Sequence, residues 1–451
     1  MKSNIDFTKG SIGKQIILFS IPMLIGNVFQ QAYSMIDGVI VGRFVGGSAL
    51  ASVGVAMNVT HLFVATLIGL TTGASVVLSQ FYGAKQDEDL KRTVATSIVF
   101  LSVLSVSMAV FGYLFAPNLL RLLNTTDEIF ADALIYLRIM MLGMVFPVFY
   151  NMYTAYLRAL GDSRSPLYIL MGATLLNIIL NVIAVALLGF GVMGAAITTI
   201  ISQAVAAVAC YFYARRFVPL LNVKKLAFDQ KLFKQILRYG IPAALQMSFG
   251  MLAILTITRL INSFGTVAIA SIIAAGKVDS LAIMPISNVG MALSTFVGQN
   301  IGAGKVERAK KGLRTTLLIL IGMAVIISTV LIFFNANLLS LFLDTADVHR
   351  TDILALGSQY LEIKVIFYFL FALLVAFTGF LRGVGDAVAA MAMPLISLGI
   401  RTLMAYLFVL WLGIGPVALA WSIPLGWASA SAISFIYYKS HRWRGKAVVR
   451  G

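Results

Sequence analysis

Apolar runs of roughly 20 residues recur from one end of the chain to the other, separated by short polar segments. Each run is long enough to cross a hydrocarbon core about 30 Å thick, and most lack the polar stripe of a soluble core helix. The pattern predicts an all-α membrane protein with twelve transmembrane helices. The predicted spans are 15–42, 49–80, 93–116, 131–157, 166–188, 192–214, 234–261, 267–298, 314–335, 353–381, 388–412 and 416–438.

The composition supports membrane integration. Of 451 residues, 60% are hydrophobic and 11% are charged, whereas soluble domains carry about 25% charged residues. A formal charge of +17 can indicate nucleic-acid binding, but here Lys and Arg lie in short loops between apolar runs, so no nucleic-acid partner is expected. The single cysteine, Cys210, lies within an apolar run and cannot form a disulfide inside the chain.

The basic residues are distributed unevenly over the predicted loops. Most lie on the side of the two termini, which also carries the central stretch 215–238 and the cluster 305–314. The opposite side has few, chiefly Arg43, Arg121, Arg259 and Arg350. Because cytoplasmic loops are enriched in Lys and Arg, we expect a multi-pass protein of the cell membrane with both termini in the cytoplasm.

The two halves of the chain repeat each other. Ile21-Pro22 and Ile241-Pro242 match at a shift of 220 residues, and three further matches follow in the same order: 80–84 with 299–303, 157–162 with 381–386, and 188–191 with 412–415. Each half holds six predicted spans, so the copies share one orientation and are related by an axis along the membrane normal. We predict an N-terminal lobe 1–214, a cytoplasmic linker 215–233 and a C-terminal lobe 234–451.

The first span carries a polar stripe. Asn27, Gln30, Tyr33 and Asp37 share an arc of about 120° on a helix and end in a carboxylate. A carboxylate in hydrocarbon is costly, so such a residue faces a wet cavity or takes up a proton. Alternatively, Asp37 lies near the end of a long helix, solvated and paired with Arg43. The equivalent positions of the second half are apolar, which places ion handling in the first half.

Four other polar residues interrupt apolar runs. Asn177 and Asn181 lie four apart on one helix face, where they either complete a pocket with Asp37 or join helices by hydrogen bonds. Lys277 and Asp279 lie inside the eighth span and either pair across helices or line the central cavity. The stretch 298–305 lacks the first glycine and the Ser or Thr of a phosphate loop, so an ion gradient is the expected energy source.

These motifs together resemble the multidrug and toxic compound extrusion (MATE) family. The first-span pattern from Pro22 to Asp37 and the paired motifs 80–84 with 299–303 and 157–162 with 381–386 carry the resemblance. It implies two pseudo-symmetric six-helix lobes in a V around a central cavity, and export of organic cations in exchange for H⁺ or Na⁺. It also implies coupling at Asp37 and a bend of the first helix at Pro22.

The chain departs from the sodium-coupled pattern of that family. Two acidic residues of that pattern are replaced by apolar residues near Phe249 and Phe371, and a fifth-span aspartate of some relatives is Asn181 here. The resemblance therefore favours a DinF-like or related bacterial branch with proton coupling through Asp37.

The resulting hypothesis is a proton-coupled antiporter for organic cations and other amphiphilic drugs. Its proposed substrate cavity comprises Asn27, Gln30, Tyr33, Asn177, Asn181, Lys277 and Asp279. We expect a monomer with no metal site and no cofactor beyond the coupling ion, H⁺ or alternatively Na⁺. Two alternatives are a lipid-linked oligosaccharide flippase of a related superfamily, which needs a cationic cavity, and an intramembrane enzyme. The second is disfavoured because no H-E-x-x-H or G-x-S-x-G pattern occurs.

Overall fold

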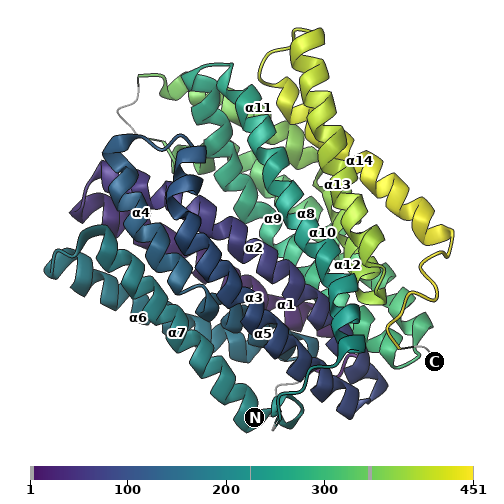
Figure 1. Ribbon diagram of the computed structural model, residues 1–451. Coiled ribbons are helices and arrows are strands. Elements are labelled where there is room, and N and C mark those ends of the chain that lie inside the picture. The colour runs from purple at the N-terminus through teal and green to yellow at the C-terminus, as the bar shows by residue number, and fades with distance from the viewer. Residues whose placement is uncertain (1–4, 224, 344–347, 450–451) are drawn as a thin grey trace. The chain divides into compact units, whose positions relative to one another are not determined.

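A computed structural model describes residues 5–223, 225–343 and 348–449. Within these ranges the regular elements are all helices and no strand occurs (Figure 1). Ten described helices are each long and apolar enough to cross a membrane, and two bent helix pairs bring the number to twelve if each pair is one span. The predicted all-α membrane fold with twelve spans is therefore confirmed.

The helices gather into two compact units. Unit 1 contains Ile21–Ala244 with residues 5–6, and unit 2 contains Phe7–Ser20 with the described part of Leu245–Gly451. The helices of the first half are α1 (Ile12–Phe44), α2 (Gly47–Ala84), α3 (Asp87–Leu122), α4 (Asp127–Leu142), α5 (Val145–Ala159), α6 (Arg164–Asn181), the π-helix η1 (Val182–Leu187), α7 (Gly191–Phe217) and the 3₁₀ turn η2 (Pro219–Leu221). Those of the second half are α8 (Gln230–Asn262), α9 (Thr266–Gly302), α10 (Val306–Ser340), α11 (Arg350–Ile366), α12 (Tyr368–Val384), α13 (Ala387–Tyr406), the π-helix η3 (Leu407–Trp411) and α14 (Ala418–Lys439).

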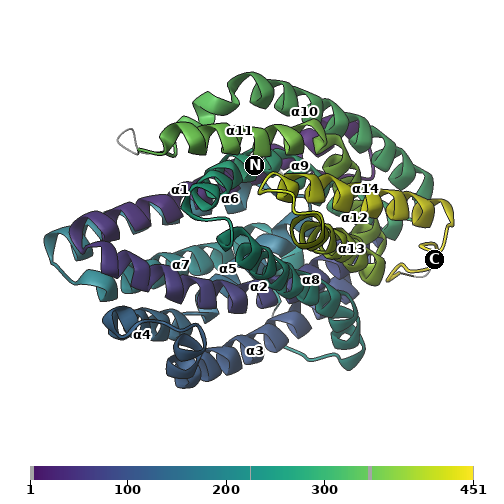
Figure 2. The same ribbon diagram turned by 90° about the horizontal axis from the view of Figure 1, so that it is seen from above.

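Equivalent helices form the core of each unit. In unit 1, α2 packs against α3, α4 and α5, and α7 packs against α4, α5 and α6. In unit 2, α9 packs against α10, α11 and α12, and α14 packs against α12 and α13, as Figures 1 and 2 both show for the neighbours α13 and α14. The π-helices occupy the same place in the two copies, directly after α6 and α13.

Two helices belong to both units. The chain passes from unit 2 to unit 1 within α1, between Ser20 and Ile21, and from unit 1 to unit 2 within α8, after Ala244. Both crossing points lie within two residues of a proline inside the helix, Pro22 and Pro242. Because proline removes one i→i−4 hydrogen bond and crowds the preceding turn, each helix has a weak point next to its crossing.

The segment 7–10, which precedes α1, is held inside unit 2 by a repeated motif. Asn300 Nδ2 donates to the Phe7 carbonyl at 3.1 Å, and Gln299 Oε1 accepts from the Phe7 amide at 3.3 Å. Arg308 adds hydrogen bonds to the carbonyls of Phe7 at 3.0 Å and Lys9 at 2.8 Å. The second copy of the motif that begins at residue 299 therefore binds the backbone that leads into α1.

The Asp that ends each copy of the repeated motif, 157–162 and 381–386, forms equivalent hydrogen bonds in the two halves. Asp162 accepts from the backbone N–H of Ser165 at 3.0 Å and from the Tyr213 hydroxyl at 3.2 Å. Asp386 accepts from the N–H of Ala389 at 3.3 Å and from the Tyr437 hydroxyl at 2.5 Å. Each carboxylate thus satisfies free N–H groups at a helix start and ties the last long helix of its half to that start.

One predicted span proves to be two helices, and a proline lies just after the break. The predicted span 131–157 is α4 and α5, which meet at 48°. Pro147 lies in the first turn of α5, where its missing N–H is tolerated. In a continuous helix its ring would clash with the carbonyl of Gly143, the residue that follows α4.

The predicted span 353–381 is also broken, into α11 and α12 at 50°. No proline lies near this break in the sequence. The Ser328 hydroxyl of α10 donates to the Val365 carbonyl at 2.5 Å, which satisfies one backbone acceptor at the end of α11. This bond supports the break, although the sequence around Phe367 contains no signal for it.

Glycine allows α2 to approach α8 within unit 1. A Cβ on Gly73 would overlap the backbone of Gly240, whereas a Cβ on Gly54 of the same helix would meet nothing within 4 Å. We expect Gly73→Ala to lower the free energy of unfolding by about 1–3 kcal/mol through overpacking. The matched control Gly54→Ala gains about 0.5–1 kcal/mol from helix propensity. Thermal unfolding of the two purified variants tests this, and equal shifts would contradict the close approach.

Candidate functional site

The carboxylate of Asp37 is buried inside unit 1, with 4% of its residue surface exposed. Asn181 Nδ2 donates to Asp37 Oδ1, and Asn181 Oδ1 accepts from the Thr198 hydroxyl at 2.9 Å. α1 supplies the acid, the end of α6 supplies the amide, and α7 supplies the hydroxyl. The alternative of a solvated Asp37 paired with Arg43 is therefore wrong: the carboxylate is buried and bonded to an amide.

Asn177 lies one turn before Asn181 and is 1% exposed. Its Oδ1 accepts from Asn181 Nδ2 at 3.4 Å, while its own Nδ2 has no hydrogen-bond partner among the described residues. A buried amide donor without a partner costs about 1–3 kcal/mol. The site therefore contains a donor that could be satisfied by a water or by an acceptor on a bound molecule.

Two tyrosines and a threonine extend this polar group. Tyr33, one turn before Asp37 on α1, donates to Thr199 Oγ1 at 3.1 Å. Tyr136 of α4 is 1% exposed and lies beside Thr199, Tyr33 and Asp37. All of these neighbours are neutral, and the described residues give Asp37 no Lys, Arg or His at ion-pair distance. The negative charge of an ionised Asp37 is thus compensated by hydrogen bonds alone.

A small pocket adjoins the site within unit 1. Its lining mixes polar and apolar side chains of three helices, and the polar ones include Gln30 and Tyr33 of α1, Thr174 of α6 and Ser202 of α7. Its volume of about 20 Å³ exceeds the 10–15 Å³ that a single water needs. Because Tyr33 lines the pocket and bonds Thr199 beside Asp37, a water here would lie one side chain away from the buried cluster.

The structure places the other predicted first-span residues on α1 as well. Asn27 is half-buried and is not among the residues that line the small pocket. Pro22 is buried, and α1 continues through it as one α-helix from Ile12 to Phe44. The predicted stripe is therefore continuous along the helix, with the buried Asp37 at its end and the half-buried Tyr33 and exposed Gln30 at the pocket.

A second buried polar group lies in unit 2. Lys364 Nζ lies 2.7 Å from Asp279 Oδ2, with the two side chains 7% and 15% exposed. The Tyr368 hydroxyl donates to Asp279 Oδ1 at 2.8 Å. The ion pair joins α9 to α11, and the tyrosine hydrogen bond adds α12 to the group. Unlike Asp37, Asp279 has a protein cation as its partner.

Lys277 does not pair with Asp279. It is exposed, and its ammonium lies 5.6 Å from the ring centre of Phe342. Residues two apart on a helix point to different sides, which is why the two charges of the eighth span separate. Of the predicted unit-2 residues, Asp279 alone is part of the buried group.

Sequence reasoning missed several members of these groups. Lys364 was visible as a lysine inside the apolar run 353–381, which is by itself a sign of function or pairing in a membrane. Tyr136, Thr198 and Thr199 had no such signal, because uncharged polar residues are common in membrane helices. Only the packing of α4 and α7 beside α1 and α6 identifies them.

Comparison with known proteins assigns both halves of the chain to one family. The MatE family model matches residues 22–183 and 242–407, once in each half of the chain. The chain is 30% identical to the "Probable multidrug resistance protein YpnP" of Bacillus subtilis, over 97% of each chain. It is 26% identical to the "Probable multidrug resistance protein NorM" of Thermotoga maritima, over 97% of this chain and 94% of that one.

The fold is also that of a solved structure. The structure described as "Crystal structure of MATE in complex with MaL6" covers 98% of both chains with a TM-score of 0.89 at 24% identity. The family match, the full-length relatives and the twelve possible spans agree. The chain therefore belongs to the MatE family of multidrug and toxic compound extrusion transporters.

Proposed function

We propose that this protein exports organic cations and other amphiphilic compounds in exchange for protons, with Asp37 as the residue that carries the proton. One observation supports this most strongly: Asp37 is a buried carboxylate whose neighbours are all neutral. A buried charge without a protein counter-ion is unfavourable. It is relieved either by a proton or by a cation that enters the site.

The two ways of compensating the charge exclude each other. Ionised Asp37 accepts the Asn181 hydrogen bond and attracts a positively charged compound. Protonated Asp37 is neutral and loses that attraction, so a proton that arrives from outside favours release of the cargo. The unpartnered Nδ2 of Asn177 and the water-sized pocket beside Tyr33 support a wet route along which the proton could reach the carboxylate.

The proposed bend at Pro22 fits the course of α1. Its first part belongs to unit 2, where Asn300 and Arg308 hold the preceding backbone. Asp37 lies in the part that belongs to unit 1. A change of packing around Asp37 would therefore act on a helix whose base is fixed elsewhere, and the missing hydrogen bond at Pro22 makes that position the easiest place to bend.

Lys277 and Asp279 remain proposed residues of the substrate cavity on the side of unit 2. Because Lys364 neutralises Asp279, unit 2 offers no uncompensated carboxylate at this place. Proton exchange is therefore assigned to unit 1. No observation favours the flippase alternative, since the buried charge of the unit-1 cluster is acidic rather than cationic. Both termini are proposed to face the cytoplasm, on the side rich in Lys and Arg.

Ethidium efflux from vesicles tests the coupling ion. The purified protein is reconstituted, and either a proton gradient or a sodium gradient at constant pH is imposed. We expect the proton gradient to drive ethidium movement and the sodium gradient to leave it at the level of protein-free vesicles. Movement driven by sodium alone would replace the proton with sodium as the coupling ion, and movement under neither gradient would contradict the proposed export of cations.

A further inference from the structure

A large groove opens between helices of unit 1, away from the Asp37 cluster. α3, α5 and α7 form it together with the segment that follows α7, and its volume is about 860 Å³. Pockets of roughly 300–1,000 Å³ are large enough for a drug-sized ligand. None of the residues proposed above for proton exchange or substrate binding lines this groove.

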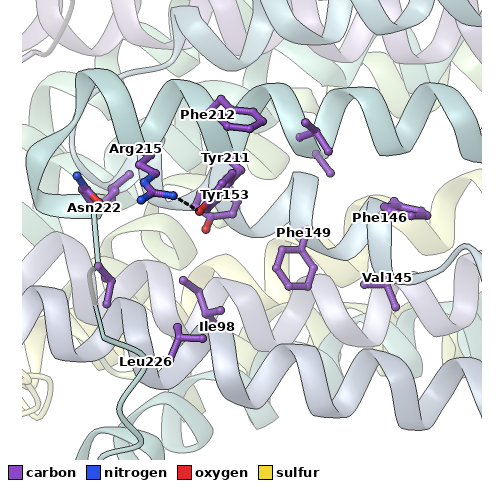
Figure 3. A pocket seen from close by; sticks show the side chains of 14 residues that line it. Ile98, Val145, Phe146, Phe149, Tyr153, Tyr211, Phe212, Arg215, Asn222 and Leu226 are labelled. Carbon is purple, nitrogen blue, oxygen red and sulfur yellow. Dashed lines mark hydrogen bonds between the residues drawn. The ribbon is translucent and has the colours of Figure 1, made fainter.

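The groove is polar at one end and apolar at the other. Figure 3 shows Arg215 and Asn222 at one end, and Phe146 and Val145 at the opposite end, with Phe149 between them. On α5 the lining extends from Tyr153 back to Val145, a helix length of about 12 Å. A ligand that fits this layout has one anionic or polar end and a long apolar part.

The charge of the polar end selects against a cationic ligand. The groove lining contains Arg215 but no Asp or Glu. Arg215 Nη1 donates to the Tyr211 hydroxyl at 2.9 Å, and the described residues give the guanidinium no acidic partner. A guanidinium has five N–H donors, so most of them stay available for an anion. Phosphate oxygens match this planar donor set well.

The position of Arg215 in the chain places it at the membrane surface. It lies in the last turn of α7, a helix that can span the membrane, and the polar segment between α7 and α8 follows it. The aromatic side chains of Phe146 and Phe212, which line the same groove, are both exposed. The polar end therefore lies at headgroup level and the apolar end reaches toward the hydrocarbon core.

We propose that this groove is a binding site for one anionic phospholipid. Its phosphate binds Arg215 beside Tyr211 and Asn222, and an acyl chain lies along Phe149, Phe146 and the α7 wall. A basic pocket between membrane helices at headgroup level is the arrangement that recognises anionic lipid headgroups. Its lining residues are not those of the substrate cavity proposed above, and the lipid site does not depend on the proposed coupling mechanism.

Cross-linking with photoactivatable lipids tests this proposal on the full-length protein. Phosphatidylglycerol and phosphatidylcholine, each with the same photoreactive group on an acyl chain, are compared in vesicles. We expect phosphatidylglycerol to label peptides 145–153 and 207–212 about five times more than phosphatidylcholine does. A preference of this size is what the attraction between one arginine and an anionic headgroup contributes near a membrane surface. Equal labelling by the two lipids would overturn the proposal.

Three variants distinguish binding in the groove from general contact with lipid. Arg215→Gln should remove the preference for phosphatidylglycerol, whereas Arg216→Gln, an exposed neighbour that does not line the groove, should keep it. Val208→Trp should fill the groove and lower labelling by both lipids. Unchanged labelling in Arg215→Gln would refute the lipid site, and competition by ethidium would identify the groove as a substrate surface instead. The thermal midpoint of each variant shows whether it is folded.

Discussion

Replacement of Asp37 by Asn is expected to abolish drug-driven proton release from reconstituted vesicles while leaving expression and folding intact. Asn has nearly the size of a protonated Asp and keeps a polar partner for Asn181, so the packing of α1 against α6 should survive. It cannot gain or lose a proton, and the charge that attracts a cation is gone. The measurement is proton release on addition of ethidium, compared with protein-free vesicles.

The same substitution should remove the pH dependence of substrate binding. In the wild type, cation affinity should fall as the pH falls, because protonation neutralises Asp37. In Asp37→Asn, the affinity for the cation should be independent of pH and equal to the low affinity of the wild type at acidic pH. At high pH it should therefore be about tenfold or more below that of the wild type, which is the contribution of one charge-assisted contact. Asp132→Asn, an exposed acid of α4, is the control and should behave as the wild type. Full activity in Asp37→Asn would eliminate the proposed mechanism.

Loss of one partner of the unit-2 ion pair should destabilise the protein strongly. Lys364→Met leaves the Asp279 carboxylate buried with only Tyr368 as its partner. Breaking a buried pair in this way costs about 3–5 kcal/mol, whereas replacing both partners by neutral residues is often nearly neutral. We therefore expect a large drop of the thermal midpoint in Lys364→Met and recovery in the double variant Lys364→Met/Asp279→Asn.

An exposed ion pair supplies the control. Lys91 Nζ lies 3.1 Å from Glu88 Oε1, and the two side chains are 39% and 79% exposed. Because water solvates such a pair, Lys91→Met should leave the midpoint unchanged. A double variant as unstable as Lys364→Met would show that the packing of these side chains, rather than their charge, holds α9, α11 and α12 together. A stable double variant that no longer transports would support a role of Asp279 in the substrate cavity.

Most of the secondary structure could be predicted from the sequence because the bilayer imposes a strict length on apolar helices. The twelve spans and the all-α fold follow from that length alone. The polar stripe that ends at Asp37 was visible because helical spacing places its members on one face. The breaks after Leu142 and Ile366 were missed, since Pro147 lies within an otherwise uniform apolar run and the second break has no sequence signal.

The candidate site could be predicted only in part. Asp37, Asn177 and Asn181 were recognised as polar residues in apolar runs, and the structure brings them into one cluster. Lys277 and Asp279 were expected either to pair across helices or to line the central cavity, and the structure pairs Asp279 with Lys364 of another helix. The hydroxyl groups of α7 carry no charge and break no pattern. They belong to the cluster only because α7 packs against α6.

The sequence by itself determined which segments cross the membrane and showed that the two halves repeat. It also identified Asp37 as the carboxylate of the first half that lies within an apolar run. These features are local, because a run of about 20 apolar side chains or a repeated motif needs no knowledge of its neighbours. The tertiary structure alone decided how polar groups pair across helices and that α1 and α8 each serve both units. Such pairing depends on the positions of side chains far apart in the chain, and in a membrane the cost of an unpaired polar group selects the partners.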